Sequence, residues 1–120
     1  MQADLDQYRD HHRLLVLFAP SAMDPRLVRQ NAAFGNEAPG MRERQLLKIV
    51  VLKDSAFPAG LDAVALRRRY KVAPNAFTAL LVGKDGTVAY RTNDPVTPKR
   101  LYALIEAMPM RRAEMRRKGG

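Results

Sequence analysis

Residues 13–18 read Arg-Leu-Leu-Val-Leu-Phe, a short apolar run that ends just before Pro20. A continuous apolar segment of this length, bounded by a proline, is typical of a strand buried in a sheet that is covered on both faces. Residues 46–53 and 77–82 carry similar runs, which we also assign to buried strands. Three such strands separated by more polar stretches favour an α/β fold.

Helices are predicted after the first two strands and at the end of the domain. Asp24-Pro25 and Thr97-Pro98 each join a side chain that can accept a backbone N–H with a proline suited to a first helical turn. We expect Gly35 and then Pro39-Gly40 to end the first helix. A second helix is predicted over residues 61–70, and a third from Pro98 to residue 108.

Lys84-Asp85-Gly86 is predicted to be a hairpin turn, because glycine tolerates the positive φ that such turns require. Residues 87–91 then form the return strand. The order becomes β-α-β-α-β-β-α, which we expect to contain two parallel βαβ crossovers and one antiparallel hairpin strand. It predicts a thioredoxin-like α/β sandwich, a mixed four-stranded sheet with helices on both faces. We assign residues 1–110 to this domain and residues 111–120 to a basic C-terminal tail.

The 120-residue chain contains no cysteine. Disulfides, thiolate-bound metals and thiol catalysis are therefore excluded. In thioredoxin-like enzymes a Cys-x-Pro-Cys motif follows the first core strand, and here Met23-Asp24-Pro25-Arg26 occupies that place. The position of the cis-proline before the third strand falls near Phe77, and Pro74 comes three residues too early. These five positions form a degenerate redox motif, in which Asp24 is interpreted as a helix cap and Arg26 as a solvated side chain or an anion contact.

No other catalytic or metal-binding constellation is predicted. Ser21 lies in the loop after the first strand, whereas His11 and His12 precede that strand and belong at the opposite end of the sheet. Adjacent histidines point apart, so they do not form a metal site with Asp10. Gly83–Gly86 lacks the spacing and the following helix of a phosphate-binding loop. We therefore predict no enzyme activity, no metal and no cofactor.

The net charge of +9 is uneven along the chain. One basic cluster lies in the tail and consists of Arg111, Arg112, Arg116, Arg117 and Lys118. A second, residues 67–69 with Lys71, is expected to face water. The tail cluster is either a solvated surface or a contact site for nucleic acid or anionic lipid. The tail has no aromatic residues to stack on bases, which favours the solvated surface.

Several segments together resemble a known family: residues 13–20, Asp24-Pro25 with Gln30, residues 80–86 (LLVGKDG) and residues 101–112, which end in Ala-Met-Pro-Met-Arg-Arg. They are similar to the bacterial domain of unknown function family 4174. They also resemble the corresponding domains of vertebrate sushi-repeat and coiled-coil-containing matrix proteins. The resemblance implies a thioredoxin-like fold related to peroxiredoxins, and it implies no established activity.

The leading functional hypothesis is a non-catalytic binding or scaffold domain for an unknown protein or peptide. Its expected contact surface is the loop of residues 19–26 with the neighbouring residues 74–78. An electrostatic binder that uses the basic tail is the second hypothesis, and a cysteine-independent oxidoreductase is the third. No membrane span is predicted, because no apolar run approaches about 18 residues. We expect a periplasmic or secreted location if a signal peptide precedes this chain, and a cytoplasmic one otherwise.

Overall fold

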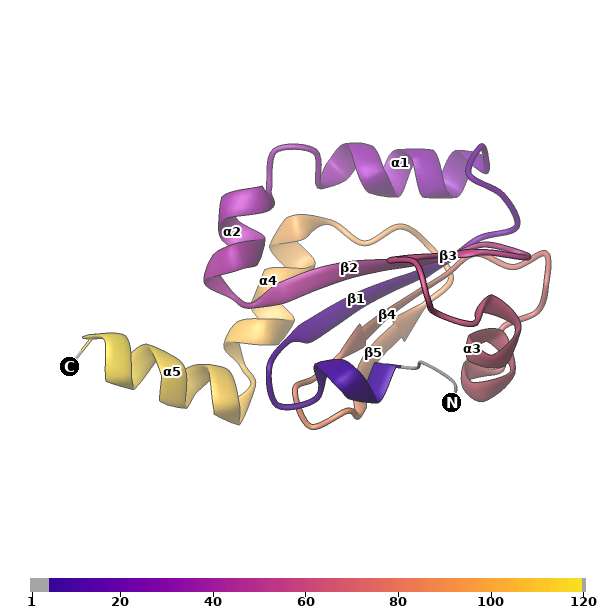
Figure 1. Cartoon of the computed structure of the whole chain (residues 1–120). Helices are drawn as coiled ribbons and strands as arrows, with labels where there is room; N and C mark the ends of the chain where they lie inside the picture. Colours follow the sequence, from indigo (N-terminus) through magenta and orange to yellow (C-terminus); the bar gives the residue numbers. More distant parts are fainter. Residues whose placement is uncertain (1–4, 120) are drawn as a thin grey trace.

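A single five-stranded sheet, in the order β3-β2-β1-β4-β5, forms the centre of the molecule (Figure 1). The computed structural model describes residues 5–119. The strands are β1 (Arg13–Phe18), β2 (Leu46–Val51), β3 (Ala56–Phe57), β4 (Thr78–Val82) and β5 (Val88–Thr92). The predicted sheet lacked β3, which is a two-residue edge strand between β2 and the helix that follows it.

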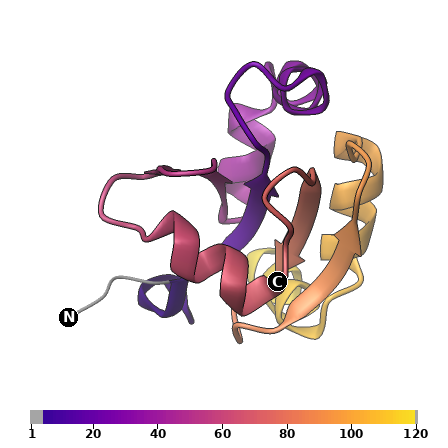
Figure 2. The ribbon, with the colours of Figure 1, turned by 90° about the vertical axis from the view of Figure 1, so that its right-hand side faces the viewer.

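Helices cover both faces of the sheet (Figures 1 and 2). They are the 3₁₀ helix η1 (Leu5–Tyr8) and the α-helices α1 (Pro25–Ala33), α2 (Ala38–Glu43), α3 (Ala63–Tyr70), α4 (Pro98–Glu106) and α5 (Pro109–Gly119). The apolar residues of α1 and α4 pack on one face, and those of η1 and α3 pack on the other. No helix among residues 5–119 is both long enough and apolar enough to cross a membrane.

All six residues of β1 are buried, which explains why its sequence shows no polar alternation. Leu15 and Leu17 enter the core beneath α1 and α4. Leu14, Val16 and Phe18 enter the core beneath α3. The central strand therefore contributes side chains to both hydrophobic layers, as its apolar run predicted.

The predicted helix starts are confirmed. The Asp24 carboxylate accepts a hydrogen bond from the Arg26 N–H at 2.9 Å, and Thr97 Oγ1 accepts one from the Arg100 N–H at 3.1 Å. Both helices have a proline in their first turn. Gly86 adopts a φ of 85° in the predicted hairpin turn. These local signals succeed because each is satisfied within a few residues of the chain.

The direction of the third core strand was predicted wrongly. β1 and β2 are parallel, but β4 runs antiparallel to β1, with Phe18 opposite Thr78. The sheet thus contains one parallel crossover instead of two. An apolar run indicates burial and gives no direction. The direction of β4 is set by the α3–β4 connection, which delivers the chain to the end of the sheet where β1 and β2 finish.

The segment after α1 also differs from the prediction. Pro39 and Gly40 do not terminate α1. They lie in the short helix α2, where Pro39 occupies the first turn. A proline in the first turn loses no helical hydrogen bond, so the same residue is compatible with a helix start.

Gln30 ties α1 to the segment that precedes α4. Its side chain is fully buried, its Nε2 donates to the Val96 carbonyl at 2.7 Å, and its Oε1 accepts from the Val96 N–H at 2.8 Å. The amide thus pairs with both backbone groups of one residue, as a neighbouring strand would. It is the only amide side chain among the buried residues that the structure describes.

Replacing Gln30 with leucine is expected to lower the free energy of unfolding by about 2–4 kcal/mol, because both Val96 groups would stay buried without partners. The measurement is urea unfolding followed by circular dichroism. Arg29→Leu, at the exposed neighbouring position, is the control and should change stability by less than about 0.5 kcal/mol. Equal stability of Gln30→Leu and the parent would show that the Val96 groups find other partners.

Candidate functional site

The two halves of the degenerate redox motif lie together at the end of β1. Arg26 forms a two-bond ion pair with Asp24, with Nη2–Oδ2 at 2.8 Å and Nε–Oδ1 at 3.0 Å. The same Nη2 donates to the Asn75 carbonyl at 3.3 Å, and the guanidinium carbon lies 5.9 Å from the centre of the Phe77 ring. The loop after β1 and the segment before β4 therefore form one surface.

This surface contains no thiol, and its one carboxylate, Asp24, is paired with Arg26. Hydrogen bonds from the Arg26 side chain hold the pKa of Asp24 at about 2, so its carboxylate stays ionised. Met23 is 80% exposed, and its thioether cannot replace a thiolate nucleophile. Phe77 is only 1% exposed, so it packs in the core beneath this surface. Asp24 acts as both helix cap and ion-pair partner.

Arg67 also lies at this end of β1, and its burial was not predicted from the sequence. It was expected to face water with its neighbours, but it is only 6% exposed. Its guanidinium donates to three carbonyls: Leu52 at 3.2 Å, Ala73 at 2.9 Å and Ala19 at 2.6 Å. Burial lowers the pKa of the Arg67 guanidinium. This side chain thereby joins the segments that follow β1 and β2 to the segment that precedes β4.

A sequence signal for the burial of Arg67 existed in the periodicity of α3. Ala63 and Leu66 are buried, and Arg67 stands four residues after Ala63 on the same side of the helix. Three consecutive arginines suggested a uniformly solvated face. In a helix, however, consecutive residues point about 100° apart, so they cannot all share one environment.

A groove of about 520 Å³ lies beside Arg67, between α3 and the β2–β3 loop. Its lining consists of Lys53, Asp54, Val64, Arg67, Arg68, Lys71, Val72, Ala73 and Pro74. Pro74 precedes Asn75, which accepts the hydrogen bond from Arg26. The groove therefore borders the degenerate redox motif and includes part of the predicted contact surface.

The basic residues of the predicted tail do not share one environment. They lie in helix α5, and Arg111 is buried with 1% exposure. Its Nε donates to Glu106 Oε1 at 3.0 Å, and its Nη2 pairs with Glu43 Oε2 at 3.0 Å. The expectation of an exposed contact at Arg111 is thus corrected, because two carboxylates hold this side chain against α2 and α4. The exposed cations of α5 are Arg112, Arg116, Arg117 and Lys118.

The remaining candidates stay apart in the structure. His11 and His12 precede β1, and Ser21 follows it, with Ser21 Oγ accepting a hydrogen bond from the Met23 N–H at 3.2 Å. Within residues 5–119, no group of three or more His, Asp or Glu side chains is arranged to hold a metal ion.

A sequence model of a domain of unknown function, DUF4174, matches residues 4–114. The chain belongs to this family. The match extends into the first part of α5 and includes both Arg111 and Glu114, the residues that fasten this helix to the rest of the domain.

The DUF4174 chain is also similar to solved structures of peroxidases. Thioredoxin peroxidase I from Plasmodium yoelii matches with a TM-score of 0.69 at 15% identity, over 88% of this chain and 77% of the peroxidase chain. Prx1a from Plasmodium yoelii matches with a TM-score of 0.63 at 16% identity, over 88% and 78% of the two chains. At this identity the likeness shows the fold alone. The thioredoxin-like fold is confirmed, and this domain carries it without cysteine.

Arg67→Met is expected to destabilise the DUF4174 domain by about 2–5 kcal/mol, because it leaves three carbonyls of partly or fully buried segments without their donor. Arg68→Met, at the exposed next position, is the matched control and should change stability by less than about 0.5 kcal/mol. Chemical unfolding of both variants measures the difference. Similar stabilities for the two variants would contradict the role of Arg67.

Asp24→Asn is expected to lower stability at neutral pH and to have a shrinking effect as the pH falls. Asparagine keeps the helix cap but removes the charge that pairs with Arg26. The folded pKa of Asp24, about 2, lies below its ordinary value of 3.8. The ion-pair contribution is therefore fully present above pH 3.8 and lost as the pH falls through 2. Unfolding curves recorded across this range should converge, and a pH-independent gap between the two proteins would refute the assignment.

Proposed function

We propose that this DUF4174 domain is a non-catalytic binding module whose groove between α3 and the β2–β3 loop takes up an extended acidic and apolar segment of a partner protein. The observation that carries the proposal is the groove itself. Its volume of about 520 Å³ falls in the range of protein ligand pockets. It also lies at the end of β1, beside the site where the redox motif is degenerate.

The lining of the groove defines the chemistry of the occupant. Val64, Val72 and Pro74 supply apolar surface, and Val64 is exposed. Lys53, Arg68 and Lys71 supply positive charge, against one carboxylate from Asp54. Within residues 5–119 none of these three cations forms an ion pair in the chain itself. An occupant with carboxylates flanking apolar side chains would complement both properties.

Exposed apolar side chains beyond the groove extend this surface. Met23 projects from the loop after β1, and Phe57 is exposed on the edge strand β3. Both belong to the end of the sheet at which β1 and β2 finish. Exposed Met and Phe side chains are common at protein interaction surfaces. They would let the partner segment continue across the edge of the sheet.

The rigid floor of the groove supports binding without a large rearrangement. Arg67 lines the groove and is fixed by its three carbonyl acceptors. A preformed surface loses little conformational entropy when a ligand binds, so modest contacts suffice for measurable affinity.

The proposal is tested with a library of fluorescent heptapeptides that combine acidic and apolar residues, compared with a library in which lysine replaces each acidic residue. We expect acidic members to bind, and the basic library not to bind. The double variant Lys53→Glu/Arg68→Glu should weaken the best peptide by about tenfold or more, since each lost charge contact contributes roughly 0.5–1 kcal/mol and is replaced by repulsion.

The matched control is Arg29→Glu/Lys99→Glu, which makes the same change in net charge at exposed positions outside the groove. It should weaken the same peptide by less than about threefold, as expected for a long-range charge effect screened by salt. Equal losses in the two double variants, or failure of every acidic peptide to bind, would refute this function.

A further inference from the structure

A second hollow, of about 560 Å³, lies at the opposite end of β1 from the groove. It is formed by the end of α2, the start of the β4–β5 turn and one side of α5. Its lining consists of Arg42, Glu43, Gln45, Lys84, Arg111, Glu114, Arg117 and Lys118. Five of these side chains are cationic and two are carboxylates, so the hollow has an excess of positive charge.

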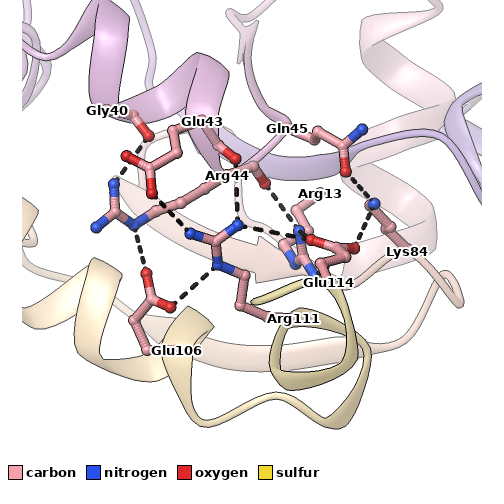
Figure 3. Close-up of polar contacts among 9 residues, drawn as sticks. All are labelled: Arg13, Gly40, Glu43, Arg44, Gln45, Lys84, Glu106, Arg111 and Glu114. Atoms are coloured by element: carbon pink, nitrogen blue, oxygen red, sulfur yellow. Dashed lines mark hydrogen bonds and ion pairs between the residues drawn. The ribbon is translucent and has the colours of Figure 1, made fainter. Parts of the chain in front are cut away.

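Two of the cations are built into the protein. Lys84 is 7% exposed, and its ammonium donates to Gln45 and, at 2.6 Å, to Glu114 Oε2 (Figure 3). Arg111 is held by Glu43 and Glu106, as described above. These positions are fixed before any ligand arrives, and partial burial strengthens the field that they exert.

The carboxylates beneath the hollow are already engaged. Glu114 accepts two hydrogen bonds from Arg13, at 3.1 and 3.2 Å, in addition to the one from Lys84 (Figure 3). Burial alone would raise the pKa of Glu114, but the hydrogen bonds from Lys84 and Arg13 outweigh it and lower the pKa. A further cation, Arg44, pairs with Glu106 at 2.8 Å. The cluster in Figure 3 thus contains four cations, Arg13, Arg44, Lys84 and Arg111, against the three carboxylates Glu43, Glu106 and Glu114.

The cations at the rim of the hollow are not neutralised. Within residues 5–119, Arg42, Arg117 and Lys118 form no ion pair, and all three are exposed. In the lining, Lys84 and Arg111 are balanced by Glu43 and Glu114, so Arg42, Arg117 and Lys118 account for the excess of positive charge in the hollow.

We propose that this hollow binds a phosphate-bearing anion, either a phosphate monoester or a diphosphate group. Arginine and lysine bind such oxyanions through charge-assisted hydrogen bonds, and a multiply charged group can satisfy several cations at once. A single carboxylate would offset only one of the three unbalanced positive charges, whereas a phosphate monoester or diphosphate group carries about two or more negative charges. The cations surround a hollow and do not follow a ridge, which suits a compact group more than a nucleic-acid backbone.

This hollow is independent of the groove between α3 and the β2–β3 loop, because the two lie at opposite ends of β1 and share no residue. Failure of one proposal therefore leaves the other in place. The phosphate group could belong to a soluble molecule or to a lipid headgroup, and the experiment separates these sources.

The test is titration calorimetry with inorganic pyrophosphate at constant ionic strength, on the parent and on two double variants. Arg117→Glu/Lys118→Glu removes two cations from the hollow. Arg112→Glu/Arg116→Glu makes the same charge change on the same helix at exposed positions outside it. We expect the first variant to weaken binding by about tenfold or more, and the second by less than about threefold.

A second arm uses vesicles of neutral lipid with and without phosphatidic acid, whose headgroup is a phosphate monoester. Binding to these vesicles with the same dependence on Arg117 and Lys118 supports the proposal with a lipid source, and pyrophosphate binding alone supports a soluble source. Two outcomes overturn it. One is the absence of binding in both arms. The other is an equal loss in the two double variants, which would indicate diffuse attraction by the +9 chain.

Discussion

The complete burial of β1 shapes the polar interactions at both ends of the sheet. The strand lies in the middle of the sheet and is covered on both faces, so polar groups at its two ends cannot rely on water. At its C-terminal end the carbonyl of Ala19 accepts a hydrogen bond from Arg67. At its N-terminal end the side chain of Arg13 is itself buried and pairs with Glu114. A buried guanidinium group therefore lies at each end of the central strand and is held there by hydrogen bonds or an ion pair.

These two guanidinium groups also lie next to the two proposed binding sites. Arg67 lines the groove beside α3, and the Arg13–Glu114 pair anchors α5, whose Arg117 and Lys118 line the second hollow. Because arginine donates several hydrogen bonds in a fixed plane, one side chain can join segments that are distant in sequence. Much of the basic character of the chain is thus structural. Within residues 5–119, Lys53 and Arg117 are among the cations that form no ion pair, and the two proposals assign them to ligand contacts.

The fold is that of the peroxidases it resembles, but the end of β1 has a different chemistry. The position of the thiol motif holds an ion pair between Asp24 and Arg26, packed over Phe77. The helix start that stabilises a thiolate in related folds is here capped by a carboxylate of the chain itself. The fold thus keeps a structured surface at this end without a thiol.

Features of the fold that depend on neighbouring residues could be predicted from the sequence. The buried strand at residues 13–18, the caps at Asp24 and Thr97 and the turn at Gly86 were all predictable, because burial and local hydrogen bonds leave a pattern within a few residues. The exclusion of thiol chemistry needs only the composition, since the chain has no cysteine to supply a thiolate.

The direction of β4 and the partners of the buried Arg67 and Arg111 depend on the tertiary structure. The acceptor carbonyl of Ala19 lies 48 residues from Arg67, and the Glu43 carboxylate lies 68 residues from Arg111. A charged side chain becomes buried only where distant segments supply its partners. No local pattern of charge or hydropathy in the sequence indicates which distant groups pair with Arg67 and Arg111. The two candidate sites therefore became apparent only in the folded structure.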